Sequence, residues 1–299
     1  MPIERPCVLC GSEKRELVHR ARTHGLDVRT VLCLDCGLVY AHPMFTEEEK
    51  LSALSAGPSA LHTPGARAGA VERHNQKRVG RYLGALEAEL GCAQTLLDIG
   101  CGDGALLREA TRRGLQAVGI EDSPQNAETA RQVSGAEVIQ GCYEPVDLGQ
   151  RRFDLVTGTH VLEHVIDPLD LLTWARGLLA EEGRLFVEVP NVMRPVTSLR
   201  RTFTLPHNYH FSPETLAALL LRAGLRPLRR RVYTRGVVSV LAVRGEEPTT
   251  GASNPAHAAE VRETLQRYRR TYYVSFRFAW RKLPAVRQRE YHSFEEHQF

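Results

Sequence analysis

The amino-acid sequence predicts an α/β protein built on a doubly wound sheet. Leu96, Leu97 and Ile99 form an apolar run of strand length that ends in a glycine-rich turn, and a helix-forming stretch (residues 105–113) follows. From here strand and helix signals alternate, a pattern typical of a parallel sheet with helices on both faces. Two Cys-x-x-Cys pairs precede this region and indicate a small metal-binding unit near the N-terminus.

Length and composition bound the class of protein. The chain has 299 residues, which is room for one substantial domain and something smaller. A hydrophobic content of 42% and a charged content of 25% are ordinary for a globular protein, and a net charge of +4 is too modest for a dedicated nucleic-acid binder. No stretch approaches the roughly 20 apolar residues that span a bilayer, and no signal-peptide core is visible. We therefore expect a cytoplasmic protein without a membrane partner.

The two Cys-x-x-Cys pairs are formed by Cys7 with Cys10 and by Cys33 with Cys36, separated by 22 residues. In a cytosolic chain such pairs indicate a metal site rather than a disulfide framework. Each pair is followed by a glycine, which suits a tight turn around a metal-bound sulfur. Four thiolates complete a closed tetrahedral shell, so the spacing predicts a structural zinc site. Unliganded or redox-active cysteines are the alternative.

The expected elements follow one another along the chain. A helix starts at Thr46, and a linker rich in Gly, Ala, Pro and Ser covers residues 55–69. Strands are expected at residues 96–99, 116–121, 137–141, 184–189, 225–233 and 237–243, with a further strand over 153–165 that runs into a helix or turn; helices are expected at residues 70–90, 105–113, 171–179, 213–223 and 256–283. We expect three units: a zinc ribbon with its linker (residues 1–66), a main domain (67–248) and a basic, aromatic helical extension (249–299).

The turn after the first strand of the main domain carries an acid and three glycines in the order D-x-G-x-G-x-G, from Asp98 to Gly104. This motif resembles the first motif of the class I S-adenosylmethionine (SAM) dependent methyltransferases. The resemblance implies that Gly100, Cys101, Gly102 and Gly104 lie against the methionine part of SAM, while Asp98 helps to hold its amino end. It also implies a Rossmann-like seven-stranded sheet whose last strand is antiparallel. A plain strand-to-helix turn is the alternative.

Two later segments match the nucleoside part of that cofactor. Glu121 lies about 20 residues beyond the glycine turn, where a carboxylate can accept hydrogen bonds from both ribose hydroxyls. The phrase GIEDSP, which contains Glu121 and Asp122, resembles the family's second motif; a strand-end acid without a ligand is the alternative. An acid commonly follows the third strand in the family, but this sequence has Cys142 there. Adenine recognition is then expected from backbone groups around Cys142 and Tyr143, or from Glu144.

The segment FDLVTGTHVLEHV (residues 153–165) resembles the family's motif after the fourth strand. We expect Thr159 and His160 to face the SAM pocket. His160, Glu163 and His164 have the i, i+3, i+4 spacing of one helix face, so a catalytic metal is conceivable there. The alternative is that Glu163 and His164 only brace the edge of the sheet.

Two further histidines lie in a region that we expect to be irregular and to form part of the acceptor pocket (residues 192–208 and just beyond). His207 stands four residues before Phe211 and Ser212, and H-x-x-x-F-S resembles the sugar C-methyltransferases, in which this histidine is a proposed base. The match is partial, because the preceding positions are leucine and proline. Histidine suits proton abstraction near neutral pH, and His210 is the other candidate. A purely structural histidine is the alternative.

Arginines crowd the C-terminal part of the chain. In the expected hairpin they are Arg226, Arg229, Arg230, Arg231 and Arg235, a set that could hold a diphosphate. In the expected last helix arginines alternate with aromatic residues, a combination that can clamp phosphates and stack on bases. We favour instead a helix that packs across the domain or a dimer partner.

These patterns predict a SAM-dependent methyltransferase with a structural zinc. The resemblance implies a small-molecule acceptor such as a nucleotide sugar, a glycan or a natural-product intermediate, with C- or O-methylation assisted by a histidine base. Two alternatives stay open. One is an RNA methyltransferase that uses the zinc ribbon and basic tail to grip RNA. The other is an adaptor that binds zinc and SAM without catalysis.

Overall fold

The computed structural model describes residues 2–23, 25–56, 79–144, 146–203, 205–234, 236–246 and 253–280. The expected linker therefore lies almost entirely outside the described residues, as do Arg235 and the end of the last expected helix. Within the described ranges, no helix combines the length and the apolar composition needed to cross a bilayer.

The main sheet has seven strands in the order β10-β11-β8-β7-β4-β5-β6. The strands are β4 (Thr95–Ile99), β5 (Gln116–Glu121), β6 (Glu137–Gln140), β7 (Phe153–Thr159), β8 (Leu179–Pro190), β10 (Leu225–Tyr233) and β11 (Val237–Arg244). Pairing is parallel from β6 through β5, β4 and β7 to β8, whereas β11 is antiparallel to both β8 and β10. Only the last strand in the chain therefore runs against the rest, as predicted.

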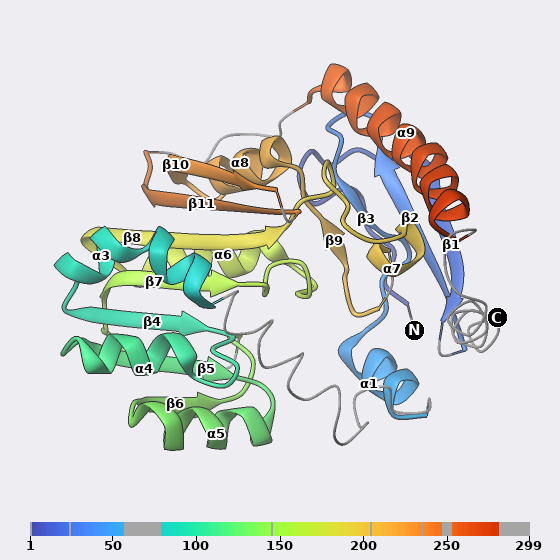
Figure 1. The fold of residues 1–299 in the computed structure, drawn as a ribbon. Helices are drawn as coiled ribbons and strands as arrows, with labels where there is room; N and C mark the ends of the chain where they lie inside the picture. The colour runs from blue at the N-terminus through green and yellow to red at the C-terminus, as the bar shows by residue number, and fades with distance from the viewer. Residues whose placement is uncertain are drawn as a thin grey trace.

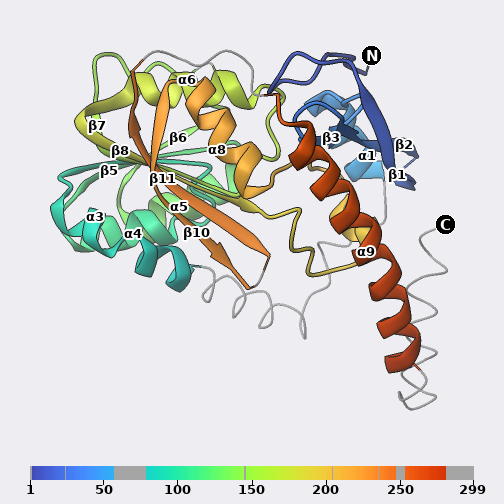
Figure 2. The ribbon, with the colours of Figure 1, turned by 90° about the horizontal axis from the view of Figure 1, so that it is seen from above.

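Helices cover both faces of this sheet (Figure 2). On one face lie α3 (Glu87–Cys92), α4 (Ala105–Arg112) and α5 (Pro124–Ser134), which share an apolar cluster with β4 and β5. On the other lie α6 (Pro168–Leu178) and α8 (Pro213–Arg222). α8 begins as the sequence predicts: Ser212 caps it through the backbone N–H of Thr215, and Pro213 occupies the first turn. This double cover explains why the inner strands β4 and β11 are mostly buried and apolar.

The order of the strands places a ligand crevice at the carboxyl end of β4. β4 pairs with β5 on one side and with β7 on the other, so the chain changes direction of winding at this strand. In open α/β sheets, ligands bind outside the carboxyl ends of the strands at such a point. The glycine turn after Ile99, the last residues of β5 and the last residues of β7 all meet here.

A second, smaller sheet has the order β1-β2-β3-β9 and is antiparallel throughout. Its strands are β1 (Arg15–Thr23), β2 (Leu26–Cys33), β3 (Val39–Ala41) and β9 (Tyr209–His210). β9 comes from the segment after β8 and pairs Tyr209 with Tyr40. Nothing in the sequence predicted this pairing, which joins the N-terminal region to the segment that carries the two expected catalytic histidines.

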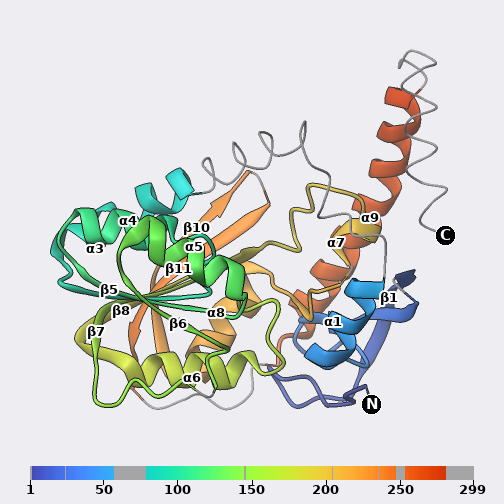
Figure 3. The same ribbon diagram turned by 90° about the horizontal axis from the view of Figure 1, so that it is seen from below.

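The small sheet lies beyond the carboxyl ends of β4, β7 and β8 (Figures 1 and 3). Its residues share one buried cluster with the main domain, in which Leu9, Leu38 and Tyr40 pack with Phe211 and Leu216. Long-range hydrogen bonds add to this contact: Arg222 on α8 donates from Nη1 to the carbonyl of Val8 (2.9 Å), and Arg5 donates to the carbonyl of Ile166 (2.9 Å). The small sheet is therefore packed onto the main one.

Further helices among the described residues are α1 (Glu47–Ala56), α7 (Leu199–Thr202) and α9 (Pro255–Trp280), and residues 79–85 are also helical. α9 runs along the small sheet (Figure 2), where Val261 and Leu265 pack on Leu32 and Val39. Its first turn is anchored by His257, which is buried and lies 2.8 Å from the hydroxyl of Ser212. The sequence-based expectation of a helix that packs across the protein matches this contact.

Candidate active site

The glycine turn after β4 has the left-handed backbone that its residues allow. Gly100, Gly102 and Gly104 have φ values of 67°, 56° and 77°. A Cβ at Gly100 would lie 2.5 Å from Cγ2 of Val161, and one at Gly104 would lie 2.7 Å from Cα of Ala130. Beside Gly102, in contrast, a Cβ would meet nothing within 4 Å. Gly100 and Gly104 are thus required for packing, whereas Gly102 leaves bare backbone beside open space.

Glu121, at the end of β5, is fixed against this turn. Its carboxylate accepts hydrogen bonds from the backbone N–H of Gly102 (2.9 Å) and of Ser123 (3.1 Å). The side chain is buried, and burial raises the pKa of Glu121 above its ordinary value. The neighbouring Asp122 is exposed to solvent. A fixed, buried carboxylate beside open backbone can accept hydrogen bonds from the ribose hydroxyls of SAM. This is the role predicted for Glu121.

Asp98 and Cys101 lie on either side of the first glycine of the turn, and both are buried. Asp98 accepts a hydrogen bond from Oγ1 of Thr157 on β7 (2.7 Å), which fixes its carboxylate at the strand ends. The thiol of Cys101 points instead toward Gly119 and the cluster beneath α4. For Cys101 the expected contact with SAM is therefore restricted to its backbone.

Cys142 and Tyr143, the two neighbouring residues expected near the adenine of SAM, differ in their exposure to solvent. Cys142 is exposed. Tyr143 is buried: its hydroxyl lies 3.2 Å from Oδ2 of Asp170 on α6, and its ring packs against Trp174 with centroids 5.6 Å apart. The side chain of Tyr143 thus belongs to the core, and only its backbone is left for the expected role at the cofactor.

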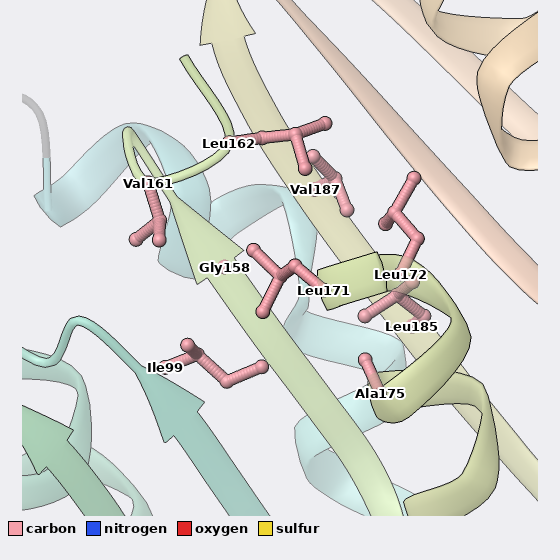
Figure 4. A pocket seen from close by; sticks show the side chains of 9 residues that line it. All are labelled: Ile99, Gly158, Val161, Leu162, Leu171, Leu172, Ala175, Leu185 and Val187. Atoms are coloured by element: carbon pink, nitrogen blue, oxygen red, sulfur yellow. The ribbon is translucent and has the colours of Figure 1, made fainter. Parts of the chain in front are cut away.

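The loop after β7 is anchored by two apolar side chains. Val161 and Leu162 line a small apolar cavity between β7, β8 and α6, together with Leu171 and Val187 (Figure 4). Residues 162–164 form a turn, so the expectation that His160, Glu163 and His164 share one helix face is wrong. The anchored loop instead presents its polar side chains individually at the edge of the sheet. Thr159, the last residue of β7, is half-buried there.

His160 has a positive φ of 57°, and its ring lies between two buried carboxylates. Nδ1 is 3.1 Å from Oε1 of Glu163, and Nε2 is 3.6 Å from Oε1 of Glu188. Burial opposes a charge on this ring, but the hydrogen bonds with Glu163 and Glu188 outweigh it and raise the pKa of His160 to about 9. A ring that is charged near pH 7 has no lone pair to accept a proton. This environment therefore does not favour His160 as a catalytic base.

Glu188 also holds an arginine that sequence reasoning missed. Arg81, in the helical residues 79–85, places Nε 3.2 Å from Oε2 of Glu188 and its guanidinium 5.4 Å from the ring centre of Tyr233. Burial opposes ionisation of Glu188, but the hydrogen bonds from His160 and Arg81 outweigh it and lower its pKa. The result is a charged network across the crevice. The partners are 107 residues apart, so no local spacing in the sequence could reveal them.

His207 and His210 lie close together, with ring centres 5.8 Å apart, in the segment that leads into the small sheet. Burial lowers the pKa of His207 to about 4, although Glu163 opposes this effect. Burial also lowers the pKa of His210 well below its ordinary value. His210 is 3% exposed and packs against Phe203 at 4.7 Å between ring centres. This covered position is that of a structural histidine, so the structure does not support His210 as a base.

Hydrogen bonds to backbone carbonyls connect the loop after β7, which carries Glu163 and His164, to the segment that carries His207 and His210. The carbonyl of Glu163 accepts from the N–H of Asn208 (2.7 Å) and of Tyr209 (3.1 Å), and Nδ2 of Asn208 donates to the carbonyl of His164 (2.7 Å). These bonds bring the ring of His207 to 4.8 Å from that of His164, measured between centres. The three side chains whose potential metal-binding atoms lie within 4.8 Å of one another are therefore Glu163, His164 and His207. His160 contacts Glu163 but is not part of this group.

The four expected metal ligands meet at one end of the small sheet. The sulfur of Cys7 is 3.6 Å from that of Cys36, and the sulfur of Cys10 is 3.5 Å from that of Cys33. Sulfurs around a tetrahedral zinc are about 3.8 Å apart, because each Zn–S bond is about 2.3 Å. Gly11 and Gly37 donate to the carbonyls of the first cysteine of each pair, at 2.8 and 3.0 Å. The cluster has the composition and size of a closed zinc shell.

Two of the hairpin arginines that the sequence suggested for a diphosphate are engaged in ion pairs with acids of the protein itself. Arg229 pairs with the buried Glu89 (3.1 Å), which also binds Arg184, and Arg230 pairs with Glu214 on α8 (3.2 Å). These ion pairs hold the edge of the main sheet to its neighbouring helices.

Comparison with known proteins gives both curated relatives and solved structures. A ubiquinone biosynthesis O-methyltransferase from Cereibacter sphaeroides (strain ATCC 17025 / ATH 2.4.3) is 34% identical over 152 residues, and that of Ruegeria sp. (strain TM1040) is 33% identical over 155 residues. Each alignment covers 46% of this chain and 62% of the relative, so this chain spans less than two thirds of these relatives.

Among solved structures, the CcbJ methyltransferase from Streptomyces caelestis has a TM-score of 0.48 and 17% identity, covering 56% of this chain and 90% of that one. Magnesium protoporphyrin IX methyltransferase from Synechocystis PCC 6803 with bound SAH has a TM-score of 0.47 and 17% identity, covering 57% and 84%. A family described as "Methyltransferase domain" matches residues 71–229, more than half of the chain. With this match over a Rossmann-like sheet, the chain belongs to the methyltransferase domain family of class I SAM-dependent enzymes.

Proposed function

We propose that this protein transfers the methyl group of SAM to a hydroxyl oxygen of a small-molecule acceptor. The crevice at the carboxyl end of β4 carries this proposal, because there a fixed carboxylate faces bare glycine backbone. The names of the curated relatives, which are O-methyltransferases, favour oxygen over carbon as the acceptor atom.

The residues of the crevice have separate tasks in binding SAM. Glu121 accepts hydrogen bonds from the ribose hydroxyls, and its two bonds from backbone N–H groups hold it in position beforehand. Asp98, oriented by Thr157, receives the amino group of the methionine part. Gly102 allows the cofactor to approach the backbone. When bound, SAM supplies a methyl group that its sulfonium already activates, so the protein contributes alignment and exclusion of water.

The acceptor would enter where the small sheet covers the carboxyl edge of the main sheet. His207 is the predicted catalytic histidine that we retain there, because it is half-buried and stands next to the loop after β7. His160, charged between Glu163 and Glu188, would act as a positioning residue that fixes both carboxylates. In this arrangement the acceptor oxygen forms a bond to the methyl carbon, the carbon–sulfur bond breaks, and sulfur retains the electron pair. The proton of the acceptor hydroxyl passes to His207.

The four-cysteine cluster is proposed to hold one structural zinc ion. Its ligands are all thiols and the shell leaves no open position, so the ion would hold the small sheet together and take no part in methyl transfer.

The proposal is tested first by calorimetry with SAM and its demethylated product, SAH. We expect binding to the wild-type protein and a loss of about tenfold to a hundredfold in affinity for Glu121→Ala, since two charge-assisted hydrogen bonds to the ribose disappear. Glu128→Gln, an exposed change on α5, serves as the matched control. Methyl transfer from labelled SAM to a panel of phenols, catechols and sugars then identifies the acceptor class. Absence of heat with both ligands would favour a non-catalytic adaptor and overturn the proposal.

A further inference from the structure

Three side chains with metal-binding atoms converge at the carboxyl edge of the main sheet: Glu163, His164 and His207. One ligand atom of each lies within 4.8 Å of the other two. Nε2 of His164 is 3.8 Å from Oε1 of Glu163. Ligand atoms that bind one divalent metal ion at about 2.1 Å lie about 3–3.5 Å apart, so small side-chain rotations bring these three into range.

The carboxylate of Glu163 has one oxygen that the protein leaves unsatisfied. The side chain is 1% exposed. Oε1 is engaged by Nδ1 of His160 at 3.1 Å, but Oε2 is buried and has no hydrogen-bond partner among the described residues. A buried carboxylate oxygen without a partner is costly, and a bound cation removes this cost. The unpartnered oxygen is therefore an observation, independent of the clustering, that points to a cation at this position.

The backbone holds the three ligands together without a metal ion. Asn208, next to His207, donates to the carbonyls of both Glu163 and His164. On the other side, Nζ of Lys50 on α1 lies 3.4 Å from the carbonyl of His164. His160 fixes the orientation of the carboxylate, as partners of a ligating carboxylate do in metal sites. A site whose ligands are fixed in this way loses little conformational freedom when it binds a metal ion.

From this geometry we propose that Glu163, His164 and His207 bind one divalent transition-metal ion, separate from the four-cysteine cluster. Two imidazoles and one carboxylate suit Mn²⁺, Fe²⁺, Co²⁺ or Zn²⁺. Three protein ligands leave coordination positions open, in contrast to the closed shell of four cysteines. Lys50 and the charged His160 face the same region and weaken cation binding, so we expect an affinity below that of a closed zinc site. That an open position takes the acceptor oxygen rests on the proposed function; binding of the ion does not. While the ion is bound, His207 serves as its ligand and not as a base.

Binding is measured with Mn²⁺ as the probe, because thiolates prefer softer metals and the cysteine cluster is expected to take up little of it. The full-length protein, with its cysteines loaded with zinc, is titrated with Mn²⁺ while electron paramagnetic resonance records the free ion. We expect one bound equivalent for the wild type. For His207→Asn and for His164→Asn, whose ring is partly exposed and tolerates change, we expect at least tenfold weaker binding. His42→Asn, a half-buried histidine outside the group, is expected to bind like the wild type.

Two results would overturn the site: no uptake of Mn²⁺ by the wild type at millimolar concentration, or equal uptake by the wild type and both ligand variants. Calorimetry with SAH on the same samples separates this inference from the proposed function. SAH binding without Mn²⁺ uptake rejects the metal site alone. Mn²⁺ uptake without SAH binding supports the metal site and rejects the proposed function.

Discussion

The two sheets of this protein are stabilised in different ways. The central strand β4 of the main sheet is buried between helices on both faces, and the apolar clusters of this sheet extend from its strands to those helices. The small sheet has an outer strand, β1, without a fully buried residue, and it depends on parts from elsewhere: four cysteines, two residues of β9 and one face of α9. This difference shows that a large sheet can be stabilised by burial of its own apolar side chains. A small sheet buries too little apolar surface and needs additional contacts, here the cysteine cluster, β9 and α9.

The largest effect should follow removal of a cysteine ligand. For Cys33→Ser we expect loss of the bound zinc and a fall of at least about 3 kcal/mol in the local opening free energy of β1–β3, because zinc binding contributes directly to folding in small metal-binding units. Hydrogen exchange by mass spectrometry, together with metal analysis, measures both quantities. Cys92→Ser, at an exposed position, is the control. Equal loss of protection in β4 and in β2 would show that the two sheets are not stabilised independently.

A smaller loss of stability is expected when one methyl group is added to the glycine turn of the main domain. Gly104→Ala forces a left-handed alanine and places its Cβ 2.7 Å from the backbone of Ala130, so α4 and α5 must separate. We expect a loss of about 2–4 kcal/mol in the free energy of unfolding. Gly114→Ala has a comparable φ of 86° but open space around it, so it should lose only about 1 kcal/mol. Urea denaturation compares the two variants, and equal losses would contradict the packing explanation.

The smallest effects are expected when one aspartate from each sheet is replaced and the free energy of unfolding is measured as a function of pH. Burial opposes ionisation of Asp154, but hydrogen bonds from the backbone N–H groups of Gln94 and Thr95 outweigh it and lower its pKa. Its contribution is therefore present above the unfolded pKa of about 4 and is lost as pH falls through the lower folded value. For Asp154→Asn we expect a loss below about 1 kcal/mol at pH 7 that vanishes as the pH falls below this lowered folded value.

The counterpart in the small sheet is Asp27, whose pKa is lowered to about 2 by hydrogen bonds from Arg20 and Arg29. Because the Asp27 side chain is 39% exposed, salt and water screen its ion pairs, and Asp27→Asn should change stability less than Asp154→Asn at physiological ionic strength. Urea denaturation at several pH values measures both variants. A larger loss for Asp27→Asn would show that exposed charges stabilise the small sheet.

Much of the fold was predictable because the signals are local. The expected strand over residues 116–121 coincides with β5, and Ser212 and Pro213 mark the start of α8. Cysteine spacing predicted the four-sulfur cluster, and the alternation of strands and helices predicted the sheet class. The loop after β7 was only partly predictable: its position followed from the strand, but the helical spacing assumed for His160, Glu163 and His164 does not exist in a turn.

The sequence alone determined the strands of the main sheet, the glycine turn and the cysteine cluster, because each depends on residues within a few positions of one another or on a repeated motif. Only the tertiary structure decided that β9 completes the small sheet, that Arg81 reaches Glu188, and that His207 joins Glu163 and His164. These contacts connect segments separated by 40 residues or more, and nothing in their local spacing records them. They form because packing the two sheets together brings distant polar groups to one buried edge, where each must find a partner.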